Sequence, residues 1–151
     1  MKASDYLLFS KELLTAYNLL CEPIRNTYHI GQVSFDILMF LFHNPAFSTA
    51  QEISEIRNIK KNLVSVHVEK LVQEGYLTRN CVPGDRRKIA LAYTEKALPI
   101  LEEGQKMQRT YFERISAGVS AEELETFRAI HEKIRKNTEG ILAAAAKGAI
   151  E

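Results

Sequence analysis

Residues 58–94 read NIKKNLVSVHVEKLVQEGYLTRNCVPGDRRKIALAYT, and this stretch decides the fold. Its first half has a helical period, because at about 100° per residue one side collects four apolar positions, Val64, Val68, Leu71 and Val72. Gly75 suits the left-handed residue that ends a helix. Beyond it, two short strands are expected at 76–82 and 88–93, around a turn at 83–85. The stretch therefore predicts a helix followed directly by a β-hairpin.

A short helix is expected immediately before this stretch. Residues 49–52, Thr-Ala-Gln-Glu, form a capping box, in which the threonine hydroxyl accepts from the Glu52 amide and the Glu52 carboxylate reaches back. The helix is expected to end near Arg57, and a tight turn follows through Asn58 and Ile59. Two short helices joined by such a turn and followed by a hairpin with a basic tip are the parts of a winged helix-turn-helix.

Two further helices are expected on the N-terminal side. Residues 4–26 have a helical period with two adjacent apolar stripes, and Pro23 is expected to kink or end that helix. Ser34 is expected to cap the next helix, which runs to about His43 and is stopped by the Asn-Pro pair at residues 44–45.

The helical period returns after the hairpin, breaks at Gly118 and starts again at a second capping box, residues 120–123. The chain is therefore expected to be mainly α with a small β-hairpin wing, in the order four helices, two strands, two helices. The apolar stripes of the first and last helices are wider than one such unit can cover, which indicates a homodimer. We expect one domain over residues 1–151, with the winged helix-turn-helix DNA-binding part at 34–94 and dimerisation helices at 1–30 and 96–147.

The basic residues are concentrated in the middle of the chain. The net charge is only +1, but residues 57–88 hold eight Lys or Arg and three Asp or Glu, so this segment carries +5 and the remainder −4. A basic segment between acidic flanks is typical of a protein with one face that meets phosphate. A solvated basic surface with no nucleic-acid partner is the alternative.

The chain lacks the sequence features of several classes of protein. The longest apolar run, residues 37–42, is far too short to span a membrane, and the N-terminus does not resemble a signal peptide, so a cytoplasmic location is expected. Cys21 and Cys81 are expected to be reduced thiols. The histidines are scattered without ligand spacing and no catalytic motif occurs, so we expect no catalytic residues, no metal and no cofactor.

The outward face of the helix near residues 60–75 is a candidate reader of double-stranded DNA. Asparagine pairs with adenine, serine with several base edges, valine packs on a thymine methyl, and lysine bonds phosphate or guanine. An ordinary surface helix would also have a polar outward face, and this alternative stays open. The candidate residues are Asn62, Ser65 and Val66, with Lys60 and Lys61 at the N-terminal end.

The hairpin tip concentrates charge next to that helix. Arg86, Arg87 and Lys88 follow Gly84 and Asp85 at an exposed turn. A guanidinium at this point can enter a narrow A·T minor groove, where the negative potential is enhanced, and Asp85 can orient one arginine through a bidentate pair. A merely solvated turn needs only the glycine and the aspartate, so the arginine pair favours contact with DNA.

At these residues the chain resembles the MarR family of multiple antibiotic resistance regulators. Residues 85–96, DRRKIALAYTEK, resemble the D-x-R wing motif of that family and the strand that follows it. Residues 34–38 are similar to its second-helix start and residues 71–77 to its reader-helix exit. The resemblance spans nearly the whole chain and implies a homodimeric regulator, with Asp85 and Arg87 as the wing salt bridge and minor-groove contact.

The chain also departs from the family pattern. Tyr93 and Ala97 stand where Leu and Gly are usual, and Val66 stands where arginine or another polar residue is frequent. Base readout would therefore rest more on Asn62 and Ser65, which puts the operator sequence in doubt and not the DNA binding.

The resemblance also implies a small aromatic or phenolic effector, bound between the dimerisation helices and the reading part. Candidate effector-binding residues are Tyr17, Cys21, Tyr28, His29, His43 and Phe47. The alternative for each is ordinary packing, since buried aromatic residues usually only pack. Redox sensing by Cys21 is disfavoured, because the neighbouring Glu22 would raise the pKa of its thiol.

The sequence therefore favours a sequence-specific transcription regulator, a repressor that binds palindromic operators as a homodimer. The main alternative is a winged helix used only for protein–protein contact. That alternative has no need for an arginine-rich hairpin tip.

Overall fold

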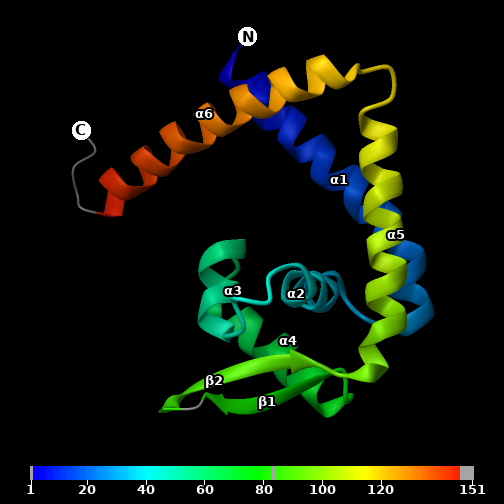
Figure 1. The fold of residues 1–151 in the computed structure, drawn as a ribbon, viewed down its shortest axis with the longest axis vertical. Coiled ribbons are helices and arrows are strands. Elements are labelled where there is room, and N and C mark those ends of the chain that lie inside the picture. The colour runs from blue at the N-terminus through cyan, green and yellow to red at the C-terminus, as the bar shows by residue number, and fades with distance from the viewer. Residues whose placement is uncertain (1, 83, 147–151) are drawn as a thin grey trace. The chain divides into compact units, whose positions relative to one another are not determined.

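The computed structural model describes residues 2–82 and 84–146, and these form two compact units that divide after Tyr111. The order of elements is the expected one, four helices, two strands and two helices, with a short 3-10 turn added (Figure 1). Their bounds are α1 Ala3–Tyr28, α2 Gln32–His43, α3 Ala50–Arg57, α4 Lys61–Gln73, β1 Leu77–Val82, β2 Asp85–Tyr93, η1 Glu95–Ala97, α5 Leu98–Ile115 and α6 Ala121–Ala146. Over the described ranges, no helix has the length and apolar character needed to cross a membrane.

The first helix does not end at Pro23. Instead α1 continues to Tyr28 and closes at His29, which takes the left-handed conformation with φ 53° and donates its amide to the Arg25 carbonyl. Proline removes one amide donor from the helix ladder. Pro23 is exposed, so this loss falls on the solvent side of α1, where water can bond the carbonyl that loses its partner.

The expectation that Ser34 caps α2 is wrong. The helix starts three residues earlier, at Gln32, with Gly31 at the N-cap, and Ser34 is buried. The Ser34 hydroxyl lies 2.9 Å from Nδ1 of His67 on α4, so it joins two helices. The predicted end of the helix at His43 is confirmed.

The remaining helix boundaries follow local signals. In the first capping box the Glu52 amide donates to the Thr49 hydroxyl at 3.2 Å and the Thr49 amide donates to the Glu52 carboxylate at 2.9 Å. The second box, between Ser120 and Glu123, has the same pair of bonds at 3.2 and 2.8 Å. Gly118 adopts φ 80° before it. Both predicted boxes are confirmed. Each depends only on residues three positions apart, so local sequence is enough to predict it.

The hairpin is antiparallel, and β2 begins at Asp85, three residues earlier than expected. Leu77 pairs with Tyr93 and Arg79 with Leu91, and the register is interrupted between Cys81 and Val82. Ile89, Leu91 and Tyr93 share one side of β2, and of these three Leu91 alone is buried. Its amide donates to the Ser48 carbonyl at 2.7 Å, which ties the wing to the loop before α3.

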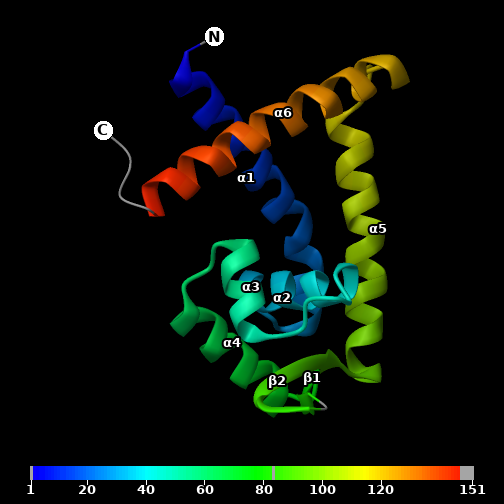
Figure 2. The same ribbon diagram turned by 60° about the vertical axis from the view of Figure 1, so that its left-hand side comes forward.

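The core lies around α2, which is buried on most of its circumference, with seven buried residues from Ser34 to Leu41. In Figure 2, α4 and the hairpin lie below α2 and α3. The largest fully buried side chains come from six elements and are Phe35, Ile37, Leu38, Ile53, Val64, Leu71, Leu77, Ile100 and Leu101, with Cys21 and Ser34. The α5 helix approaches α2 closely at Gly104, where an added Cβ would lie 2.5 Å from Met39 Sδ and 3.1 Å from Phe35 Cζ.

Gly104→Ala should therefore destabilise the protein, although alanine is the better helix former. Overpacking a core costs about 1–3 kcal/mol, and the gain in helix propensity is about 1 kcal/mol, so a net loss of about 1 kcal/mol is expected. Urea unfolding of Gly104→Ala in the wild-type and Met39→Ala backgrounds measures it. Met39→Ala removes the closest of these atoms, so an equal loss in both backgrounds would contradict this account.

Candidate nucleic-acid interface

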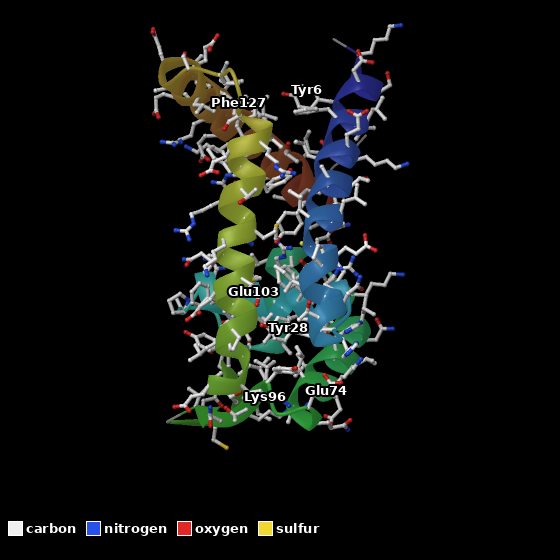
Figure 3. The ribbon with its side chains drawn as sticks, turned by 90° about the vertical axis from the view of Figure 1, so that its right-hand side faces the viewer. Tyr6, Tyr28, Glu74, Lys96, Glu103 and Phe127 are labelled. Carbon is white, nitrogen blue, oxygen red and sulfur yellow. The ribbon has the colours of Figure 1, made fainter. Side chains whose placement is uncertain are left out.

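The turn between α3 and α4 sets the position of α4. Asn58 takes the left-handed conformation with φ 50° and donates its amide to the Ser54 carbonyl. Ser54 is buried, and its hydroxyl donates to the Ile59 carbonyl at 2.7 Å. At the other end, Lys96 Nζ donates to the Glu74 carbonyl at 2.7 Å and lies over the Tyr76 ring (Figure 3). Both ends of α4 are thus held by bonds to neighbouring segments.

The two faces of α4 are those expected from the sequence. Val64, Val68 and Leu71 are buried, and Val72 is half-buried. On the opposite side Asn62, Ser65 and Val66 are exposed, and Val66 has 65% of its surface in solvent. Ser65 donates its hydroxyl to the Lys61 carbonyl at 2.9 Å, and Asn62 Oδ1 accepts from the Leu63 amide at 2.9 Å. An exposed valine between two polar side chains makes this a face of mixed chemistry.

The N-terminal end of α4 has an unfavourable charge for an isolated helix. Lys60 is the N-cap, Lys61 is the first helical residue, and the first turn holds no acidic residue. Cations at the positive end of a helix dipole are destabilising, whereas anions are favoured there. Both lysines are exposed, so this end of α4 suits an external anion such as a phosphate.

Lys88 of the wing already has a partner. Lys88 Nζ lies 3.6 Å from Glu52 Oε1, so the N-terminus of α3 and β2 are linked by an ion pair. Backbone hydrogen bonds from Thr49 and Ser48, with a contribution from Lys88, hold the pKa of Glu52 below its usual value. Asp85 is exposed at the start of β2.

Arg86 and Arg87 belong to β2, but their side chains lie outside what the structure describes. Their predicted contacts therefore stay predictions.

A pair that the sequence analysis did not find joins α4 to the wing. Arg79 Nη2 of β1 donates to Glu69 Oε2 of α4 at 2.7 Å, and Gln73 Nε2 donates to the other Glu69 oxygen at 3.1 Å. The Arg79 bond, its charge and the Gln73 bond hold the pKa of Glu69 below its usual value. The alternation of side chains along a strand could have indicated this contact, because Arg79 lies two residues after the buried Leu77 and therefore on the same side of β1.

The candidate effector residues do not all meet. Gln108 of α5 donates from Nε2 to the Tyr17 hydroxyl at 2.9 Å, and its Oε1 lies 2.7 Å from His43 Nε2. These three side chains line a cavity of about 100 Å³ together with Asp36 and the exposed Arg57. Sequence reasoning had no signal for Gln108, because the bridge depends on the packing of three helices.

Burial controls the ionisation of the groups beside this cavity. It raises the pKa of Tyr17 to about 12 and raises the pKa of the Cys21 thiol and of the Asp36 carboxyl. Cys21 is fully buried, so desolvation is the main cause of its shift. The expected direction for this thiol agrees with the structure, but the cause is burial and not Glu22.

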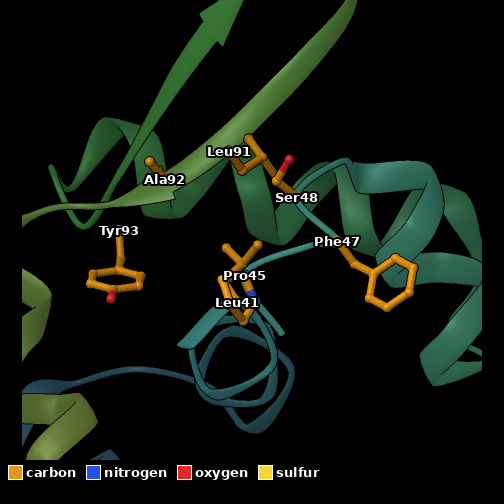
Figure 4. Close-up of a pocket in the computed structure, with 7 residues that line it drawn as sticks. All are labelled: Leu41, Pro45, Phe47, Ser48, Leu91, Ala92 and Tyr93. Atoms are coloured by element: carbon orange, nitrogen blue, oxygen red, sulfur yellow. The ribbon is translucent and has the colours of Figure 1, made fainter. Parts of the chain in front are cut away.

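Phe47, Tyr28 and His29 lie elsewhere. Phe47 borders a second cavity, of about 200 Å³, whose other lining residues are Leu41, Pro45, Ser48, Leu91, Ala92 and Tyr93 (Figure 4). Tyr28 lies at the C-terminal end of α1, where its hydroxyl donates to Glu103 Oε1 of α5 at 2.8 Å (Figure 3). His29 is exposed at the end of α1. The structure thus joins Tyr17 and His43 through Gln108, places Cys21 next to Tyr17, and separates the other three.

Comparison with known proteins gives the same fold and one family. Residues 30–88 match the MarR family. An HTH-type transcriptional regulator of Bacillus subtilis (strain 168), YdgJ, is 25% identical over 114 residues, which cover 76% of this chain and 69% of that protein. The match therefore extends beyond the segment from α2 to the wing.

Two solved structures have the same fold. A MarR protein from Peptoclostridium difficile has a TM-score of 0.78 at 22% identity, over 93% of this chain and 91% of the other. The MepR protein of S. aureus, in a complex with DNA, has a TM-score of 0.72 at 16% identity, over 91% and 96%.

Proposed function

Because residues 30–88 identify this chain as a winged-helix protein of the MarR family, we propose that it is a repressor that binds operator DNA as a homodimer. The observation that carries the proposal is the exposed face of α4 with two lysines at its N-terminus, next to a hairpin with a basic tip. YdgJ, named as a transcriptional regulator, and MepR, seen with DNA, support it. As a DNA-binding regulator, the protein would act in the cytoplasm.

In this proposal α4 lies in the major groove. Asn62 pairs with an adenine edge, Ser65 bonds a base edge once it leaves the Lys61 carbonyl, and Val66 packs on a thymine methyl. Lys60 and Lys61 bond phosphates at the positive end of the helix. Phosphate contacts orient the protein and base contacts give specificity, so α4 supplies both.

The wing binds the adjacent minor groove in the same proposal. Arg87 enters the groove with Asp85 as its partner, and Arg86 grips a phosphate. Lys88 can reach a phosphate only by leaving Glu52, at 3.6 Å, so part of its attraction to DNA replaces an existing ion pair. Lys88 should therefore contribute less to the free energy of DNA binding than an unpaired lysine would.

Selection of bound sequences from random duplex DNA tests the proposal and supplies the operator. Arg87→Ala should weaken binding to selected and random duplexes and lower the salt slope by about one unit, because one phosphate-like contact is lost. Asn62→Ala should cost about 1–3 kcal/mol on the selected site and much less on random DNA.

The matched control is Arg109→Ala, which removes the same charge from an exposed site on α5. Melting curves verify the folding of each variant. If Arg87→Ala leaves the salt slope unchanged on both duplexes, the wing is not a DNA contact. If wild-type protein selects no sequence, the chain is not a sequence-specific DNA-binding protein.

The homodimer is supported by the two terminal helices, each considered separately. On α1, Leu7, Leu14 and Leu19 are each more than 60% exposed. On α6, a helix of 26 residues without a buried residue among its described positions, Phe127 and Ile141 have 57% and 62% of their surface exposed. Apolar faces of this extent are stable in water when a second copy covers them. A two-fold dimer then fits an operator that is an imperfect palindrome, with half-site centres roughly 34 Å apart.

Charges placed on the apolar face of α1 should prevent this association. The double variant Leu7→Asp, Leu14→Asp should sediment as a monomer or aggregate at micromolar concentration, where wild-type protein sediments as a dimer, because a buried unpaired carboxylate is strongly unfavourable. Lys106→Asp, which places an aspartate on an exposed site of α5, should leave the dimer intact. A double variant that remains a folded dimer would contradict the assignment of α1 to the interface.

We further propose that a small aromatic or phenolic effector weakens DNA binding. The cavity beside Phe47 is partly open to solvent and has a volume of about 200 Å³, which is enough for a single ring, since a closed apolar cavity of about 150 Å³ holds benzene. The cavity between Tyr17 and His43 is about half as large and more polar. Phenol is therefore the appropriate probe.

Phenol should raise the melting temperature of wild-type protein, because it binds the folded form. It should also reduce operator affinity, because it favours a dimer in which the two α4 helices do not have the spacing of the half-sites. Phe47→Ala should abolish the shift if the larger cavity is the site, and Tyr17→Phe if the smaller one is. A screen of phenols and benzoates that finds no binder to DNA-active protein would contradict the effector proposal.

A further inference from the structure

We propose that Arg79 is a further phosphate contact at the junction of α4 and the wing, and that Glu69 is the positioning residue that orients its guanidinium. This inference rests on the proposed DNA binding. It concerns a pair outside the reading residues and the hairpin tip. The pair joins the two elements that are proposed to enter different grooves.

The register of the hairpin directs Arg79 toward the helices. Arg79 pairs with Leu91, and cross-strand partners point to the same face of a sheet. Leu91 is buried, so this face is the one that packs on the core. From there the arginine reaches α4, where Nη2 donates to Glu69 Oε2 at 2.7 Å. Its side chain is 40% exposed, so it is anchored on one side and open to solvent on the other.

Glu69 lies on the proposed reading face of α4. It follows Asn62 by seven positions and Val66 by three, which places all three on one side of the helix. The side chain of Glu69 is 49% exposed, and the carboxylate is held ionised by Arg79 and Gln73. An isolated carboxylate on this face would repel phosphate. The Arg79 charge offsets that repulsion.

Arg79 has the donors to serve Glu69 and a phosphate together. A guanidinium has five N–H donors in a planar fork that matches both carboxylate and phosphate. Within residues 2–82 and 84–146, the structure shows one Arg79 hydrogen bond, to Glu69. Glu69 in turn is bonded at both oxygens, by Arg79 and by Gln73 at 3.1 Å. The carboxylate therefore holds the guanidinium between α4 and β1, with donors left for a phosphate.

Two other roles for the pair have distinct consequences. An exposed salt bridge that only stabilises the fold contributes little, so its loss would change melting slightly and DNA binding hardly at all. If Glu69 instead accepts from a cytosine amino group, its substitution would change binding to the operator and not to random DNA. A positioning role predicts an effect on both kinds of DNA that requires Arg79 to be present.

The test compares charge-removing variants at several salt concentrations, on the selected operator and on random duplex. Arg79→Ala should weaken both complexes about tenfold and lower the salt slope by about one unit. Arg79→Lys should keep most of the slope, because the charge remains. Glu69→Gln removes a negative charge close to the DNA, so simple electrostatics predicts tighter binding, whereas a positioning role predicts weaker binding.

Glu74→Gln is the matched control, because Glu74 lies at the end of α4 and pairs with a cation, Lys70, at 3.8 Å, but not with Arg79. It should leave binding unchanged or slightly tighter. Glu69→Gln should weaken binding severalfold in the wild-type background and have no effect in the Arg79→Ala background. This double-mutant cycle distinguishes positioning from simple charge removal, and melting curves of each variant confirm that it is folded.

The inference is overturned if Arg79→Ala leaves the salt slope unchanged, or if Glu69→Gln and Glu74→Gln act alike. An effect of Glu69→Gln on the operator alone would assign it to base reading and would overturn positioning. If wild-type protein itself shows no salt-dependent binding to any duplex, the proposed function fails together with this inference. If wild-type binds and only the Arg79 and Glu69 predictions fail, the proposed function remains.

Discussion

The packing of α2 into the centre of the first unit is the constraint on which the other elements depend. Phe35, Ile37 and Leu38 are completely buried, so α2 contacts neighbours around most of its circumference. Interiors are packed to crystal-like density, and for that reason each neighbour has little freedom to shift. The approach of α5 at Gly104 is closer than a Cβ would allow. The bond between Ser34 and His67 adds a polar tie from α2 to α4.

The wing is held in place by the burial of Leu77 and Leu91 and, from two sides, by polar contacts. One backbone bond, from Leu91 to the Ser48 carbonyl, connects β2 to the loop before α3. Two ion pairs, Lys88 with Glu52 and Arg79 with Glu69, connect the hairpin to α3 and α4. Isolated two-stranded hairpins are marginally stable, so these connections make the wing part of the unit. Because the ion pairs are exposed, salt and nearby phosphates weaken them more than they weaken the core.

The cavity near Tyr17 combines polar groups with low solvent access. Burial raises the pKa of the Cys21 thiol, which lowers its thiolate fraction and therefore its reactivity. The same burial disfavours the charged form of Asp36, and coulombic attraction by Arg57 and Arg25 opposes it only in part. Both shifts favour the neutral forms of the groups in and near this cavity.

The sequence by itself determined the features that depend on neighbours a few positions apart. The two capping boxes, the left-handed Gly75, the helix break at Gly118 and the two faces of α4 follow from hydrogen bonds and periodicity within one turn of helix. Only the tertiary structure decided the partners of Ser34, Glu69 and Gln108, because each bond joins residues that are brought together by packing. The separation of Phe47 from Tyr17 was decided in the same way, since local patterns carry no information on which side of α2 a distant ring will lie.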